Sequence, residues 1–169
     1  MTHVIAIASQ KGGVGKTTTA INLGASLAVA EKRTLVLDID PQGNATSGLG
    51  VTDRESRPTV YDVLIGNSSL SEAVVPEVHF RHLDVVPSTR DLVGAEIELV
   101  SAESRELVLR NALSAIRDSY DFILVDCPPS LGLLTLNTLT AANSVLIPIQ
   151  CEFYALEGLS QLLNTVRVV

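Results

Sequence analysis

The sequence predicts an α/β fold in which a mostly parallel β-sheet carries helices on both faces. Short apolar runs alternate with segments of helical periodicity along the chain, which is the pattern that βαβ units produce. Several of the runs are nearly all apolar, as expected for strands covered on both sides. With 46% hydrophobic and 18% charged residues, the chain has the composition of a globular protein. We expect a single domain over residues 1–169.

The expected elements follow one another in a regular order. The expected strands are His3–Ala8, Thr34–Leu37, His82–Val86, Asp121–Val125 and Ser144–Ile149. Helical periodicity covers Thr17–Ala30, Val60–Ile65, Asp91–Ser101, Glu103–Ser119, Leu133–Ala141 and Ala155–Val168. The polar stretch Asp53–Pro58 breaks the pattern and is expected to be a surface loop. The last helix ends without a glycine cap or polar tail, so we expect residues 1–169 to be the N-terminal two-thirds of a longer domain.

Between the first expected strand and the first expected helix lies a glycine-rich segment that we call the phosphate loop, residues 11–18. Its residues are Lys11, Gly12, Gly13, Val14, Gly15, Lys16, Thr17 and Thr18. Glycines let backbone N–H groups approach an anion closely, and the following helix N-terminus adds a positive dipole end. In such a loop Lys16 can reach the terminal phosphates and the Thr17 hydroxyl can ligate Mg²⁺. All eight residues are therefore candidates for binding a nucleotide together with Mg²⁺.

The phosphate loop departs from the common P-loop pattern at its front. The pattern G-x-x-x-x-G-K-[ST] would place its first glycine at the position of Gln10. Instead a second lysine, Lys11, stands beside that position, and Lys11 and Lys16 are two of only three lysines in the chain. Two ammonium groups around one turn repel each other unless an anion lies between them. The pair therefore favours a phosphate site over a solvent-exposed glycine turn.

Three aspartates follow apolar strands, at the edge of a parallel sheet where ligands bind. Asp38 and Asp40 follow Leu35-Val36-Leu37, and Asp126 ends Phe122-Ile123-Leu124-Val125. An apolar strand that ends in aspartate, downstream of a phosphate loop, is the Walker B pattern, and its carboxylate holds Mg²⁺. Asp38 and Asp40 alternate along an extended segment and should point to opposite sides. Position alone does not decide which of the two faces the metal and water.

These segments together resemble the ParA/MinD family of deviant Walker A ATPases. The phosphate loop is similar to the family's loop, in which the extra lysine crosses a dimer interface to the partner's nucleotide. The segments 38–44 and 126–130 resemble its switch I and switch II. Three further segments, 44–50, 94–100 and 150–158, look most like chromosomal ParA proteins of the Soj type.

The resemblance implies roles for single residues. Lys11, Lys16 and Asp40 become the expected catalytic residues, with Lys11 as the signature lysine and Asp40 positioning or activating the attacking water. Thr17, Asp40 and Asp126 become the expected metal ligands. The segment Glu152–Gly158 matches part of the family's dimer contact.

The resemblance also implies a cellular function. The expected protein is a cytoplasmic, nucleoid-associated ATPase that partitions a chromosome or plasmid. It is expected to dimerise on ATP and to bind DNA non-specifically in that state. A ParB-type partner is expected to reset it by stimulating hydrolysis. The resemblance implies that most of the DNA-binding surface lies beyond Val169. The net charge of −7, which does not favour nucleic-acid binding by this segment as a whole, agrees with that expectation. No membrane contact is expected. The uncharged stretch Cys127–Gln150 contains three prolines and predicts a loop, a helix and a strand rather than a bilayer helix.

Three alternatives remain open at this point. A MinD-type regulator of the division site shares the loop and both switches, and would be distinguished by an amphipathic basic helix at its C-terminus. An iron–sulfur carrier needs cysteines placed to bridge a cluster, whereas Cys127 and Cys151 lack a C-x-x-C spacing and are interpreted as reduced thiols. A nucleotide-dependent scaffold would bind ATP without turnover.

Overall fold

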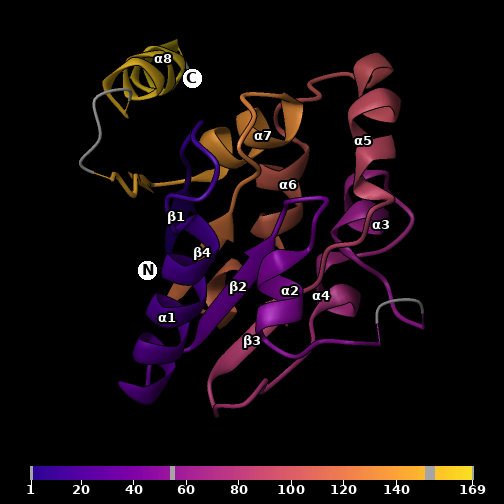
Figure 1. The fold of residues 1–169 in the computed structure, drawn as a ribbon. Helices are drawn as coiled ribbons and strands as arrows, with labels where there is room; N and C mark the ends of the chain where they lie inside the picture. The colour runs from indigo at the N-terminus through magenta and orange to yellow at the C-terminus, as the bar shows by residue number, and fades with distance from the viewer. Residues whose placement is uncertain (1, 54–55, 151–154, 169) are drawn as a thin grey trace.

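The computed structural model describes residues 2–53, 56–150 and 155–168 and shows a five-stranded, all-parallel sheet with the strand order β3-β2-β4-β1-β5 (Figure 1). The strands are β1 (His3–Ile7), β2 (Thr34–Asp38), β3 (Leu83–Val86), β4 (Phe122–Asp126) and β5 (Ser144–Leu146). The central strands β2 and β4 are paired in register from Thr34 opposite Phe122 to Asp38 opposite Asp126. The two aspartates that end these strands therefore lie side by side.

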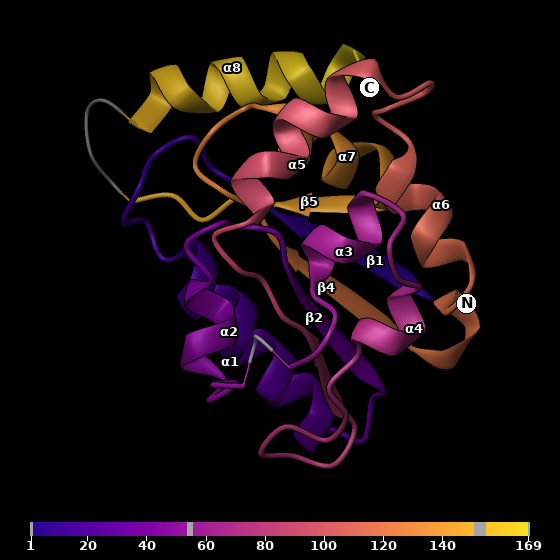
Figure 2. The ribbon, with the colours of Figure 1, turned by 90° about the vertical axis from the view of Figure 1, so that its right-hand side faces the viewer.

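Helices of very different lengths connect the strands. They are α1 (Lys16–Val29), α2 (Asn44–Gly48), α3 (Val60–Leu64), α4 (Leu70–Ala73), α5 (Leu92–Glu98), α6 (Val108–Ser114), α7 (Leu133–Ala141) and α8 (Ala155–Val168), with short 3₁₀ turns at Leu99–Ser101 and Arg117–Ser119. Figures 1 and 2 show α1 and α2 on one side of the sheet and α3, α6 and α7 on the other.

The sheet separates two apolar clusters because side chains alternate along each strand. Val36 and Leu124 face α1 and α2, whereas Leu35, Leu37 and Ile123 face the helices of the opposite side. All these side chains are completely buried. Burial on both faces explains why the strands are nearly continuous apolar runs, and the predicted doubly covered parallel sheet is confirmed.

Close packing of α1 on the sheet depends on one small residue. A Cβ atom added to Gly24 would lie 2.8 Å from Cγ2 of Val36, so the helix approaches β2 at a distance that only glycine allows. This places the start of α1 directly above the carboxyl ends of the strands.

Several predicted boundaries are confirmed and a few are wrong. Helices α7 and α8 have the predicted bounds, whereas the single helix expected over Glu103–Ser119 is interrupted. Ser104 has a φ of +52°, which a right-handed helix does not permit, so α6 begins only at Val108. Strand β5 ends at Leu146 rather than Ile149, two residues before Pro148, which lacks the N–H group needed to extend the ladder. The short helices α2 and α4 were not predicted.

Candidate nucleotide site

The phosphate loop has the backbone shape of an anion cradle. Gly13 and Gly15 have φ values of +74° and +94°, which residues with a Cβ atom rarely adopt. Added Cβ atoms at Gly12, Gly13 or Gly15 would meet no atom within 4 Å, so the concave side of the loop is not filled by neighbouring protein groups. The loop therefore has both the conformation and the space needed for phosphate oxygens.

Helix α1 opens directly from this loop, with Gly15 as its N-cap. No side chain caps its first N–H groups, and its first turn contains no acidic residue. The N-terminus of this 14-residue helix consequently keeps its positive dipole end available for an anion. Lys16, which is only 8% exposed, folds back so that Nζ donates to the carbonyl oxygen of Lys11 at 3.4 Å. Its ammonium group thus lies against the backbone at the front of the loop.

Thr17 and Asp126 meet beneath the start of α1. The Thr17 hydroxyl donates to Oδ2 of Asp126 at 2.7 Å. The other oxygen, Oδ1, is buried and accepts no hydrogen bond within the described part of the chain. Burial raises the pKa of Asp126 to about 7, and the neighbouring charges of Asp38 and Asp40 add to the rise. A buried carboxylate oxygen without a partner, next to a threonine hydroxyl, suits a cation that binds hard oxygen ligands.

Asp38 has a different environment, although it lies opposite Asp126 in the sheet. Its side chain is completely buried and both oxygens are occupied. Oδ1 accepts from the N–H of Asp40 at 3.1 Å, while Oδ2 accepts from the N–H and the hydroxyl of Thr46 at 2.8 and 2.7 Å. Burial raises the pKa of Asp38, and these hydrogen bonds oppose the rise. Asp38 therefore supports its own loop.

Asp40 is the more accessible of the two switch I aspartates. It is 8% exposed, and its Oδ1 accepts from the N–H of Gln42 at 2.9 Å. No hydrogen bond to Oδ2 occurs among the described residues. The contrast with Asp38 supports the assignment that sequence position left open, with Asp38 as the structural partner and Asp40 as the residue that can serve water or metal.

Residues from the end of the described chain also reach the loop. Gln150 donates from Nε2 to the carbonyl oxygen of Gly13 at 3.1 Å, and Gly158 on α8 lies against Gln10. A hollow of about 240 Å³ lies between the loop front, the end of β5 and α8. Residues 152–154 of the expected dimer contact over Glu152–Gly158 lie outside those that the structure describes, as does Cys151, and the rest of the segment begins α8. Cys127 is buried, and burial raises its pKa to about 12, which agrees with a reduced structural thiol.

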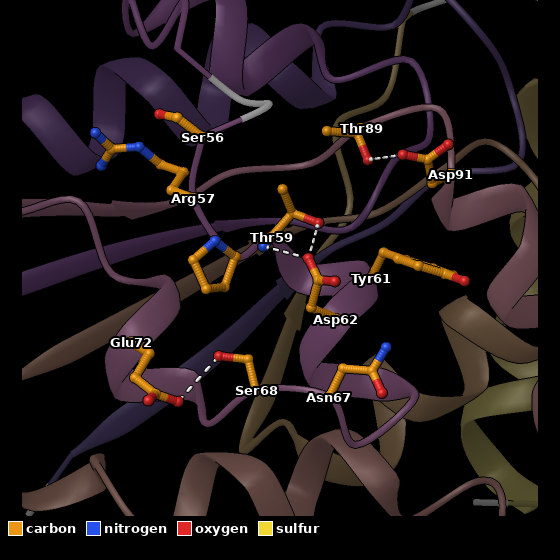
Figure 3. A pocket seen from close by; sticks show the side chains of 11 residues that line it. Ser56, Arg57, Thr59, Tyr61, Asp62, Asn67, Ser68, Glu72, Thr89 and Asp91 are labelled. Carbon is orange, nitrogen blue, oxygen red and sulfur yellow. Dashed lines mark hydrogen bonds between the residues drawn. The ribbon is translucent and has the colours of Figure 1, made fainter.

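A larger polar hollow of about 840 Å³ lies elsewhere and contains no residue of the phosphate loop (Figure 3). Two of its three carboxylates, Asp62 and Glu72, cap helices, and the third, Asp91, accepts from the Thr89 hydroxyl at 3.3 Å. Asp62 accepts from the N–H of Thr59 at 2.8 Å, and Glu72 accepts from the N–H of Ser69 at 2.8 Å. Both pairs are capping boxes at the starts of α3 and α4. Two of the acidic groups in this hollow thus have a structural role in capping helices.

Two features, a cluster of metal-ligating side chains and a membrane-spanning helix, are absent among the described residues. Within these residues, no three side chains of the histidine, cysteine, aspartate or glutamate type gather as a metal cluster. Mg²⁺ sites in nucleotide enzymes commonly use one or two protein carboxylates together with phosphate oxygens, so such a cluster is not required. No helix among the described residues has the length and apolar character needed to cross a membrane.

Comparison with known proteins supplies the family. A family model described as AAA domain matches residues 2–169. The chain is 59% identical over 169 residues to the sporulation initiation inhibitor protein Soj of Bacillus subtilis, and 59% identical over 167 residues to the chromosome partitioning protein ParA of Myxococcus xanthus. The chain belongs to the AAA-domain family, in its ParA and Soj branch.

These two matches cover 100% and 99% of this ParA-type chain but 66% and 59% of the relatives, so the chain spans about two thirds or less of their length. Solved structures give the same picture. Cobyrinic acid a,c-diamide synthase from Mycobacterium smegmatis, with bound ADP and magnesium, superposes with a TM-score of 0.93 at 43% identity, covering 100% of this chain and 68% of that chain. A putative plasmid partition protein from Borrelia burgdorferi bound to AMPPNP gives 0.91 at 29% identity, covering 99% and 69%. The predicted family and fold class are confirmed.

Proposed function

We propose that this chain is the nucleotide-binding part of a DNA-partitioning ATPase that binds ATP with Mg²⁺, dimerises and is reset by hydrolysis. The observation that carries the proposal is the contact between Thr17 and Asp126 beneath the α1 N-terminus, which leaves a buried carboxylate oxygen with no donor among the residues that the structure describes. The Soj and ParA relatives support partitioning as the process, and the neighbours solved with ADP, magnesium or AMPPNP support the ligands.

Each group in the site has a defined task under this proposal. The loop N–H groups and Lys16 bind the phosphates, with Lys16 neutralising charge on the terminal ones. Thr17, Asp126 and Asp40 would hold Mg²⁺ directly or through water, and the ion, when bound, supplies charge neutralisation on the phosphate oxygens. Asp40 orients the attacking water. Phosphoryl transfer requires positioning and charge stabilisation rather than covalent chemistry, and these groups supply both from within one subunit.

The proposal extends to partners that one chain does not contain. Lys11, at the front of the loop, serves the nucleotide of a second subunit, and the Glu152–Gly158 segment contributes to the contact between subunits. A ParB-type protein stimulates hydrolysis, and non-specific DNA binds the ATP-loaded dimer through a surface mostly beyond Val169, which places the protein on the nucleoid in the cytoplasm. The 169-residue piece alone should hydrolyse ATP weakly.

The test of ATP binding is Lys16→Ala in the intact protein. Each charge-assisted hydrogen bond contributes about 1.5–3 kcal/mol, so affinity for ATP should fall at least tenfold, a change of about 1.4 kcal/mol. Titration calorimetry with ATP and Mg²⁺ measures it, and Lys32→Ala, which changes the one lysine outside the loop, is the matched control. If the two variants bind ATP with equal affinity, the phosphate loop is not the ATP-binding site.

A further inference from the structure

We propose that Ser88 and Thr46 are positioning residues for hydrolysis, because they lock the peptide of Asp40 in one orientation. The inference rests on the proposed function and adds two residues to which the sequence assigned no individual role. Ser88 follows β3 and Thr46 lies in α2, so the two come from separate connections of the sheet. Both side chains are completely buried.

The lock is a continuous chain of hydrogen bonds. The Ser88 hydroxyl donates to the carbonyl oxygen of Asp40 at 2.8 Å, and the Ser88 N–H donates to the Thr46 hydroxyl at 2.9 Å. That hydroxyl donates in turn to Asp38 Oδ2 at 2.7 Å, and Asp38 Oδ1 accepts from the Asp40 N–H at 3.1 Å. The chain thus starts and ends at the backbone of Asp40.

Holding Asp40 at both its N–H and its C=O fixes the direction in which its side chain leaves the backbone. The Asp40 carboxylate belongs to the site, whereas none of the bonds in the lock involves the phosphate loop. A loosened lock should consequently disturb the orientation of the attacking water more than the capture of ATP. Misplacement of a catalytic group by about 1 Å can reduce a rate roughly a hundredfold, so a buried lock of this kind has a kinetic consequence.

The lock also has a fixed base. The carbonyl oxygen of Pro87 accepts from the N–H of Val60 at 2.9 Å, which ties the segment before Ser88 to the start of α3. Asp38, at the other end, lies in the sheet opposite Asp126. The backbone of Asp40 is therefore anchored to the rigid sheet and to a capped helix, and not only to a surface loop.

The experiment uses the intact protein with Thr46→Val, Thr46→Ser and Ser88→Ala. Thr34→Val is the matched control, since it removes another fully buried hydroxyl from the opposite end of β2, where Thr34 donates to the carbonyl oxygen of Lys32 at 2.9 Å. Phosphate release gives kcat and KM, titration with a fluorescent ATP analogue gives affinity, and thermal unfolding shows that each variant is folded.

We expect Thr46→Val and Ser88→Ala to lower kcat about ten- to a hundredfold while affinity changes less than about threefold. Thr46→Ser, which keeps the hydroxyl, should return kcat close to the wild-type value, and Thr34→Val should leave it unchanged. Should Thr46→Val fail to fold, Ser88→Ala decides alone, because it removes a single hydroxyl.

Two kinds of result overturn the inference. If kcat stays within twofold of wild type in Ser88→Ala, or if affinity falls in parallel with kcat, the residues do not act through Asp40. If Thr46→Ser is as slow as Thr46→Val, the hydroxyl is not what matters. A wild-type protein that binds ATP but releases no phosphate would instead overturn the proposed function itself.

Discussion

Replacing Asp126 by asparagine should raise the stability of the nucleotide-free protein, relative to wild type, more at pH 8 than at pH 5, although it damages the proposed metal site. Burial raises the pKa of this carboxyl from its ordinary value of 3.8 to about 7. The folded state therefore holds the proton more tightly than the unfolded state does. The resulting cost to stability is absent below about pH 4, grows as the pH rises toward 7, and is complete above that value.

The magnitude follows from the size of the rise. A tenfold change in an equilibrium constant corresponds to about 1.4 kcal/mol, so the full cost is about 4 kcal/mol, of which about 1.5 is already present at pH 5. Asparagine does not ionise, and its own packing cost is independent of pH. Relative to wild type, Asp126→Asn should thus gain about 3 kcal/mol between pH 5 and pH 8, or about 5–10 °C in melting temperature for a chain of this size.

The assay is thermal and urea unfolding at both pH values, with a chelator present and nucleotide absent. Asp121→Asn is the control. The hydrogen bond from Arg33 lowers the pKa of Asp121 to about 2, so that carboxylate is ionised in both states at pH 5 and at pH 8. Its replacement should shift stability equally at the two values. A difference between Asp126→Asn and wild type that is the same at pH 5 and pH 8 would refute the reasoning.

Two further predictions concern packing and reactivity. Gly24→Ala should destabilise the protein by about 1–3 kcal/mol in urea unfolding, because the new Cβ meets Val36. The control Gly94→Ala, whose new Cβ meets the flexible end of Glu98 at 3.3 Å, should be neutral or slightly stabilising. Equal effects of the two substitutions would contradict the close approach of α1 to β2. Cys127 should resist iodoacetamide in the native protein, because burial raises its pKa to about 12, and become alkylated on unfolding. Peptide mass spectrometry distinguishes it from Cys151, and rapid native labelling of Cys127 would show that the thiol is accessible.

The sheet and the phosphate loop were predictable because their signals are local. Continuous apolar runs indicated buried parallel strands, and the glycine-rich segment between the first strand and helix indicated the cradle. Helix α4 was missed although Ser69 and Glu72 form a capping box, a signal that could have found it. Helix α2 has only five residues with a glycine at its end, and so short a helix depends on tertiary contacts.

The arrangement of the three aspartates in the site could be predicted only in part. Sequence placed Asp38, Asp40 and Asp126 at strand ends but did not decide between the first two. The proposed assignment of Asp38 as the structural partner rests on Thr46, whose two hydrogen bonds occupy Asp38 Oδ2. Ser88 could not be found because its partner in space, the carbonyl oxygen of Asp40, lies 48 residues earlier and is reached only because β3 packs beside β2.

The measurement that tests the central claim most directly is a mixing experiment with Lys11→Ala and Asp40→Ala subunits of the intact protein. If Lys11 serves the partner's nucleotide, a mixed dimer contains one site with an intact Asp40 in one subunit and an intact Lys11 from the other. Phosphate release by the mixture should then exceed that of either variant alone, since a charge supplied in trans is worth roughly 10³–10⁵ in rate. If mixed dimers form and remain as inactive as the separate variants, Lys11 acts within its own subunit and the account of the shared site is contradicted.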